Sequence, residues 1–258
     1  DSIIAVTGTE LTVSGVISGG HGITKAGAGT LILSNANTYS GSTTINAGTL
    51  ALAASDVIAN GSNVIINGGT LDLGVYSDTV AAVTVGVNGG SIISSTGVLT
   101  GSSYTFNNTN PALISARLAG AGSVTQAGIG ATTLSGLNSY SGGTFLNAGS
   151  LIVASDANLG NASGSITFNG GALNSVASFT LSAARAIALS GNGIFNVDAL
   201  TTLTFNGIIT GSGTLTKTGL GTLILGGNNT YTGSTAINTG AITITGSLAD
   251  TADITVDS

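Results

Sequence analysis

Apolar and polar residues alternate over short stretches of this chain, and tight-turn residues interrupt the alternation. In TTINAGTLAL, residues 43–52, apolar positions recur at every second residue on both sides of Asn46-Ala47-Gly48. A two-residue period is typical of a strand, whose successive side chains point to opposite sides. The pattern predicts that the following side chains point inward: Leu31, Leu33, Ile45, Leu50 and Leu52. It directs Thr30, Ile32, Thr44 and Thr49 outward.

The interrupting turns recur at an almost constant spacing. Three of them are 21 residues apart, and later ones, including Gly193, continue at 22. Asn and Gly tolerate positive φ, so we assign these residues to structural turns: Asn46, Gly48, Asn67, Gly69, Asn88, Gly90, Asn147, Gly149, Asn169 and Gly171. Bends at intervals of 21–27 residues favour a coil, because a hairpin sandwich would show turns every 8–12 residues.

The pattern therefore predicts an all-β fold, a right-handed parallel β-helix (solenoid) of about eleven coils. Each coil would hold about three short strands stacked roughly 4.8 Å apart, in a column on the order of 50 Å long. Each coil packs only on its neighbours, so residues 1–258 should form a single domain. The least regular part is 98–117, which contains the only proline, Pro111. We expect a protruding loop or a distorted coil there.

Composition and charge exclude several classes of protein. With 42% hydrophobic and 5% charged residues, 42 Gly and one Pro, the chain is neither disordered nor collagen-like. It contains no apolar run of 18 or more residues, so we expect no direct membrane insertion by this segment. Four Lys and Arg against ten Asp and Glu exclude nucleic acid as a partner. Cysteine is absent, which excludes disulfides and thiolate metal sites.

Three longer segments, 19–52, 120–153 and 211–244, have very similar sequences and start 101 and then 91 residues apart. Each contains G-x-G, then an apolar or Thr-rich stretch, then N-x-Y-x-G. The last motif supplies the candidate corner residues: Asn37, Tyr39, Gly41, Asn138, Tyr140, Gly142, Asn229, Tyr231 and Gly233. The middle copy is the most degenerate, because Gln126 stands where the others have Lys25 and Lys217.

This pattern closely resembles the passenger-associated transport repeat of autotransporters, the type V secreted proteins of Gram-negative bacteria. The copies lie near 17–52, 118–153 and 209–244. The resemblance implies that the chain is a segment of a passenger domain, a β-helix that is extracellular, on the bacterial cell surface or secreted. It also implies a partner in the full-length chain, a C-terminal translocator barrel, which is not present in residues 1–258. Asp1-Ser2-Ile3-Ile4 does not read as a signal peptide, so an exported protein would be represented here by a mature or excised fragment.

Two interpretations of the N-x-Y-x-G motif are open. The tyrosines could form an exposed face that contacts sugar or protein. Alternatively, the motif is a coil corner, in which Asn and Gly make the bend and Tyr lays its ring over the edge of the core with its hydroxyl in water. We favour the corner.

Residues for catalysis or for cofactor binding are poorly represented. His21 is the only histidine and lies in Gly19-Gly20-His21-Gly22, away from any nucleophile motif. We interpret five scattered acids as solvated loop residues: Asp56, Asp72, Asp78, Asp156 and Asp198. Asp250, Asp253 and Asp257 form a loose acidic tail that we also expect to be solvated. We predict that the chain is not an enzyme and holds no metal or cofactor.

We predict a surface-exposed adhesin segment that mediates attachment to host cells and matrix, or bacterial self-aggregation. Its partner would be a host protein or glycan, or a second passenger, held by many weak contacts on a stiff column. One alternative is a structural stalk that aids secretion and presents an effector nearer the N-terminus. A polysaccharide-acting β-helix enzyme is the remote alternative. The sequence itself assigns no binding residue.

Overall fold

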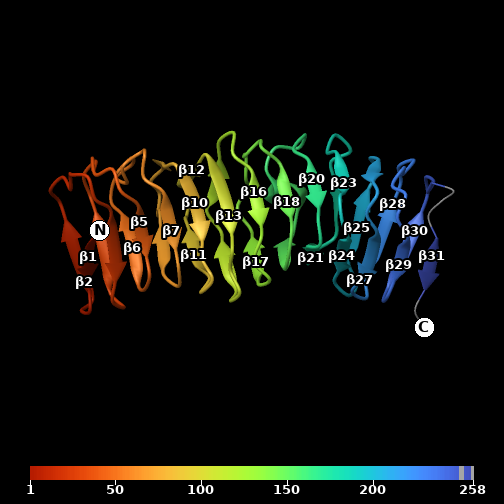
Figure 1. Ribbon diagram of the computed structural model, residues 1–258, viewed down its shortest axis with the longest axis horizontal. Coiled ribbons are helices and arrows are strands. Elements are labelled where there is room, and N and C mark those ends of the chain that lie inside the picture. Colours follow the sequence, from red (N-terminus) through yellow and green to blue (C-terminus); the bar gives the residue numbers. More distant parts are fainter. Residues whose placement is uncertain (250–252, 257–258) are drawn as a thin grey trace.

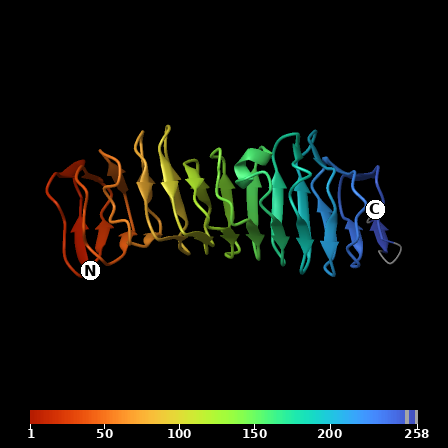
Figure 2. The same cartoon turned by 90° about the horizontal axis from the view of Figure 1, so that it is seen from above.

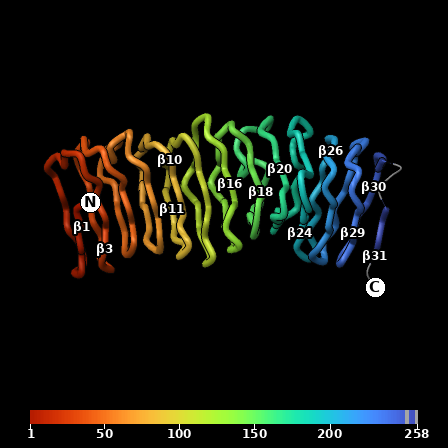
Figure 3. Tube along the Cα trace, viewed as in Figure 1, coloured from red at the N-terminus to blue at the C-terminus, as the bar shows by residue number. Residues whose placement is uncertain are grey.

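The computed structural model describes residues 1–249 and 253–256 as one elongated column, with the two ends of the chain at opposite ends of it (Figure 1). The Cα trace winds around the long axis coil after coil (Figure 3). Every strand pairing is parallel, and the stacked strands make a solenoid of about twelve turns. The predicted all-β parallel solenoid is confirmed, with about one turn more than expected.

Two sheets run along the column. The first sheet has 11 strands, in the order β1 (Ser2–Ala5), β3 (Ile23–Ala26), β5 (Thr43–Ile45), β7 (Val64–Ile66), β10 (Ala82–Val85), β13 (Ser103–Phe106), β16 (Val124–Gln126), β18 (Thr144–Leu146), β20 (Ile166–Phe168), β23 (Ile187–Leu189) and β26 (Ile209–Gly211). The second has 13, in the order β2 (Glu10–Val13), β4 (Thr30–Leu33), β6 (Thr49–Leu52), β8 (Thr70–Asp72), β11 (Gly90–Ile93), β14 (Ala112–Ile114), β17 (Ala131–Leu134), β19 (Ser150–Val153), β21 (Ala172–Ser175), β24 (Gly193–Val197), β27 (Leu215–Thr218), β29 (Thr235–Ile237) and β31 (Ile254–Val256).

The third face of the column is only partly a sheet, so the expectation of three strands in each coil was too regular. One group of strands there is β9 (Asp78–Thr79), β12 (Val98–Thr100) and β15 (Arg117–Ala119). The other is β22 (Phe179–Leu181), β25 (Thr202–Phe205), β28 (Thr222–Leu225) and β30 (Ala241–Ile244). Between the two groups the chain forms a corner at Asn138–Gly142 and the 3-10 turn η1 (Asp156–Leu159), the green helical turn in Figure 2.

The core is a set of ladders running along the column. Leu31 pairs in register with Leu50, Leu50 with Leu71, and Leu71 with Ile92. The side chains predicted to point inward are buried, and those predicted to point outward are partly exposed. Burying one such Leu contributes about 1.5–3 kcal/mol relative to leaving it exposed. Apolar side chains stacked at the same position of successive coils thus hold these coils together.

The turns need glycine for two different reasons. At Gly48, φ is +63°, and an added Cβ would lie 2.4 Å from the carbonyl oxygen of Gly29 in the preceding coil. At Gly69, φ is not positive, but a Cβ would meet Ile45 at 2.5 Å. Of the described non-glycine residues, only Asp56 and Leu200 have positive φ, so the Asn turn residues do not adopt the conformation we assigned to them. Asn67 instead accepts a hydrogen bond from the backbone N–H of Asn88 (3.3 Å) through its side chain.

The segment 98–117 is a complete coil, which corrects the prediction of a protruding loop or a distorted coil. It contains β12, β13 and β14, one strand on each face, all paired in register with both neighbouring coils. Pro111 does not distort the coil, because it lies in a turn between two strands. The turn equivalent to Gly89-Gly90 is Pro111-Ala112, since Gly90 pairs with Ala112.

The third long repeat is rotated by one face relative to the first two. The strands that open the first and second copies, β3 and β16, lie in the first sheet, whereas the corresponding β27 lies in the second. The 101 residues between the first two copies make five whole turns, from β3 through β5, β7, β10 and β13 to β16. The next 91 residues make four turns and one further face, so the same text ends on a different side of the column.

Candidate functional site

The three corner tyrosines are core residues. Tyr39, Tyr140 and Tyr231 are almost completely buried, and each hydroxyl pairs with a buried threonine four residues later. The oxygen–oxygen distance is 2.8 Å in Tyr140–Thr144. Burial raises the pKa of all three tyrosines above the usual value. The structure thus places them where no ligand reaches them, and the expected water-exposed hydroxyl was wrong.

The corner asparagines join three successive coils. The Oδ1 atom of Asn138 accepts from the backbone N–H of Leu118 (2.7 Å), and its Nδ2 donates to the carbonyl oxygen of Asn158 (2.6 Å). Asn37 and Asn229 make the same kind of bridge at their own corners. These side chains replace backbone ladder bonds where the chain leaves the strand conformation.

The corner glycines allow a close approach between coils. A Cβ on Gly41 would lie 2.1 Å from the backbone nitrogen of Gly22, and one on Gly233 would lie 2.2 Å from the carbonyl oxygen of Gly213. Gly142 is equally crowded, at 2.6 Å from the backbone of Gly122. Any side chain here would push two coils apart.

Two lysines are buried in the core beneath the G-x-G turns, which the sequence did not suggest. The Nζ of Lys25 donates to the carbonyl oxygens of Ala26, Gly27 and Ala47 at 2.7–3.0 Å. Lys217 makes the equivalent three bonds at 2.6–3.3 Å, and burial lowers its pKa to about 8. Both ammonium groups thus serve as buried donors to carbonyl groups of the G-x-G turn and of the following coil.

In the degenerate middle copy an uncharged side chain donates hydrogen bonds to the carbonyl groups of the G-x-G turn. Gln126, fully buried, donates from Nε2 to the carbonyl oxygens of Gly128 (2.8 Å) and Gly130 (3.1 Å). Its neighbour Thr132, which stands in place of an apolar residue, donates to Oδ1 of buried Asn108 (3.1 Å). The departures of this copy from the repeat pattern therefore form one connected polar cluster.

Two of the acids expected to be solvated are in fact structural. Asp78 is 1% exposed, and its Oδ2 accepts the backbone N–H groups of Val57 and Ile58, both at 3.0 Å. Its Oδ1 has no partner, and burial raises its pKa to about 6. Asp156 forms a salt bridge with buried Arg185 (2.6 Å).

The remaining candidates for chemistry do not come together. Asp56 and His21 are exposed, and Asp72 and Asp198 are partly exposed in separate coils. Asp253 is exposed, while Asp250 and Asp257 lie outside the described residues. Within the part of the chain that the structure describes, no group of three or more His, Cys, Asp or Glu is arranged to hold a metal ion.

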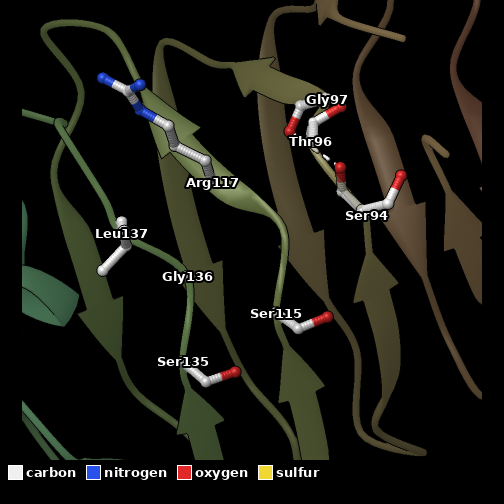
Figure 4. A pocket seen from close by; sticks show the side chains of 9 residues that line it. Ser94, Thr96, Gly97, Ser115, Arg117, Ser135, Gly136 and Leu137 are labelled. Atoms are coloured by element: carbon white, nitrogen blue, oxygen red, sulfur yellow. Dashed lines mark hydrogen bonds between the residues drawn. The ribbon is translucent and has the colours of Figure 1, made fainter. Parts of the chain in front are cut away.

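A hollow large enough for a small molecule lies on an edge of the column, in its middle coils (Figure 4). It has a volume of about 380 Å³ and spans three successive turns between the second sheet and the third face. Its lining is made of Ser94, Ser95, Thr96, Gly97, Ser115, Arg117, Ser135, Gly136 and Leu137. We call this hollow the Arg117 groove.

Arg117 is the chain's only exposed lysine or arginine, because Lys25, Lys217 and Arg185 are buried. Its side chain forms no hydrogen bond or salt bridge within residues 1–249 and 253–256. Figure 4 shows its guanidinium projecting at the outer end of the groove, above Leu137 and apart from the serine hydroxyls. Five N–H donors therefore remain available to a partner.

Six of the fifteen large apolar side chains that are exposed in the described part of the chain lie along the same edge. We call the turns that lead from the second sheet to the third face the Arg117 edge. It displays Val16, Val75, Leu137, Val176, Leu200 and Leu220, exposed at 42% to 101%. Leu200 combines full exposure with φ of +64°. The rotated third repeat contributes Leu220, whereas its counterpart Ile129 lies on the edge between the first and second sheets.

Sequence reasoning missed the Arg117 edge because no motif marks it. Arg117 and Leu137 are 20 residues apart, and Leu200 is a further 63 residues away. The signal was present in one respect: the 20–22-residue period, applied to exposed positions, would have aligned Leu137 with Arg117 and Ser135 with Ser115.

The comparisons with known proteins agree with the architecture. Residues 23–52, 124–153 and 215–244 match the family model of the passenger-associated-transport repeat. Over 147 residues, 57% of the chain, the sequence is 37% identical to the adhesin BmaC autotransporter of Brucella suis biovar 1 (strain 1330). The resemblance to autotransporter passenger domains is thus confirmed: the chain is a parallel β-solenoid with three passenger-associated-transport repeats. It spans 4% of the length of that curated relative.

No solved structure matches the chain. None of the described helical residues forms a helix long and apolar enough to cross a membrane. The corner motifs matched by the repeat family are therefore interpreted from the geometry of this column alone.

Proposed function

We propose that this segment is an adhesive part of an extracellular autotransporter passenger and that it attaches through the Arg117 edge. The observation that carries the proposal is the distribution of side chains. The Asn and Tyr side chains of the corner motifs are buried, whereas the Arg117 edge presents the exposed arginine together with six exposed apolar residues. Exposed apolar clusters with a polar rim mark interaction sites.

The adhesin in the comparison supports attachment as the activity, and the shape of the column suggests how attachment becomes strong. Equivalent edge positions recur with every turn, roughly 4.8 Å apart. A partner that lies along the edge would meet many small contacts in succession, whose effects combine through valency. The partner is a host surface or matrix component, or a second passenger, and the segment sits outside the cell, attached in the full-length protein to a translocator barrel.

We propose a non-catalytic role. Burial raises the pKa of Asp78 to about 6, but its carboxyl group is buried and accepts hydrogen bonds from the backbone N–H groups of Val57 and Ile58. The groove holds hydroxyl groups and a guanidinium, and no carboxylate or imidazole that could act as a general acid or base.

Beads coated with residues 1–258 test the proposal, with clumping and binding to cultured host cells as two readouts. The double variant Leu200→Asp with Leu220→Asp changes the Arg117 edge. Val87→Asp with Ile129→Asp introduces the same charges on the edge between the first and second sheets and serves as the control. Loss of clumping or of cell binding in the first variant alone supports the proposal. Equal effects of both variants, or wild-type beads that neither clump nor bind, would favour a passive stalk instead.

A further inference from the structure

We propose that the Arg117 groove binds a saccharide carrying a single carboxylate, such as a terminal acidic sugar. The inference rests on the proposed adhesive function for its biological setting only, because binding of a sugar can be measured without adhesion.

The first argument concerns the charge. Arg117 is exposed, and no described acid pairs with it. A guanidinium offers parallel N–H donors in a planar fork that matches a carboxylate. The chain as a whole has net charge −6, so a highly charged polyanion would be repelled more strongly than a ligand with one negative charge.

The second argument concerns the serine hydroxyl groups that line the groove apart from the guanidinium. Ser115 and Ser135 occupy successive rungs of one ladder, and their hydroxyls form no hydrogen bond within the described residues. Figure 4 shows both directed to the same side. A hydroxyl both donates and accepts, as sugar hydroxyls require. By contrast, the hydroxyl of Ser94 is already used, donating to the carbonyl oxygens of Gly74 (3.0 Å) and Gly97 (2.9 Å).

The third argument favours sugar over peptide. A peptide usually gains affinity by pairing its backbone with an exposed strand edge. Several backbone N–H groups along the groove are already bound to the preceding coil, as in Ser115 and Ala116, which donate to Ile92, and Ser135, which donates to Ile114. The groove therefore does not offer the continuous row of free backbone groups that an added strand needs.

The fourth argument concerns size and the apolar contact. A volume of about 380 Å³ lies near the lower end of the roughly 300–1,000 Å³ typical of small-molecule pockets, so a terminal sugar fits better than a long chain. Leu137, 69% exposed, offers an apolar surface below the guanidinium on which the carbon face of a sugar ring can rest.

The experiment titrates the intact chain with sialyllactose, using calorimetry and saturation-transfer NMR. The methyl ester of the same sugar keeps the shape and removes the charge. We expect weak binding, with a Kd on the order of 1 mM, and a loss of about tenfold or more for the ester and for Arg117→Gln. Val87→Gln, at an exposed turn outside the groove, should bind as the wild type does. Circular dichroism checks that each variant is folded.

Three results would overturn the proposal: no binding of sialyllactose, equal binding of the ester, or equal binding by Arg117→Gln. Binding of a short Glu-containing peptide with the same affinity and the same dependence on Arg117 would also overturn the assignment to saccharides. If the protein binds the sugar but the beads do not adhere, the saccharide proposal stands and the proposed adhesive function is refuted. If Arg117→Gln leaves adhesion unchanged and the protein binds no sugar, the saccharide proposal is refuted and the adhesive function stands.

Discussion

Arg185 lies inside the loop of the preceding coil, where its Nε donates to Oδ1 of Asp156 over 2.6 Å. The rest of the guanidinium donates to carbonyl oxygens of that loop, including those of Leu159 (3.0 Å) and Asn161 (2.8 Å). A single side chain thus supplies the hydrogen bonds that a strand would otherwise provide where η1 interrupts the third face. The charge is fully desolvated, yet every part of it has a partner.

Removing this side chain should be costly. We expect Arg185→Met to lower the free energy of unfolding by about 3–5 kcal/mol, because Asp156 and several buried carbonyls lose their donor. Arg117→Met, which removes the exposed arginine, should change stability by less than about 0.5 kcal/mol. Urea denaturation followed by circular dichroism compares the two. Similar losses in both variants would contradict the structural role of Arg185.

The corner motif predicts an order of effects. Asn138→Ala leaves the N–H of Leu118 and the carbonyl of Asn158 unpaired, which should cost about 2–4 kcal/mol in the free energy of unfolding. Tyr140→Phe removes one hydroxyl pair and should cost only about 1 kcal/mol. The exposed Asn35→Ala serves as the control and should be almost neutral. The interpretation fails if Tyr140→Phe proves more damaging than Asn138→Ala.

The middle repeat predicts which substitution a buried lysine tolerates. Gln126 shows that an amide can serve the G-x-G turn, so Lys25→Gln should retain most of the wild-type stability. Lys25→Met has a similar length but no donor, and should cost about 1–3 kcal/mol for the carbonyls left unpaired. Thermal unfolding distinguishes the two variants. Equal melting temperatures would show that the buried donor is dispensable.

Asp78 predicts a stability that depends on pH. Burial raises its native pKa from 3.8 to about 6, so between these values the native protein holds a proton that the unfolded chain has released. The free energy of unfolding should therefore fall as pH rises through this window, by about 3 kcal/mol in total. The stabilisation is fully present below the lower value. In Asp78→Asn this fall should disappear, which denaturation at a series of pH values would reveal.

The sequence by itself determined the solenoid. The alternation of Leu and Ile with Thr specifies which side chains face the core, and the turns at intervals of 21–27 residues specify a coil, because both are local properties repeated along the chain. The three N-x-Y-x-G motifs were equally visible, although in the structure their Asn side chains bridge neighbouring coils and their Gly residues allow close approach.

Only the tertiary structure decided how the coils are aligned, and alignment controls the rest. The lengths of all the intervening turns decide on which face a repeat 91 residues further along begins. The rotation of the third repeat, and with it the position of Leu220, therefore cannot be predicted from any single segment. The burial of Lys25, Asp78 and Arg185 has the same origin. Each of these groups bonds at least one backbone group of an adjacent coil, about 20 residues or more away in sequence. The free arginine at position 117 is distinguished from the buried one at 185 only by what the neighbouring coils place around it.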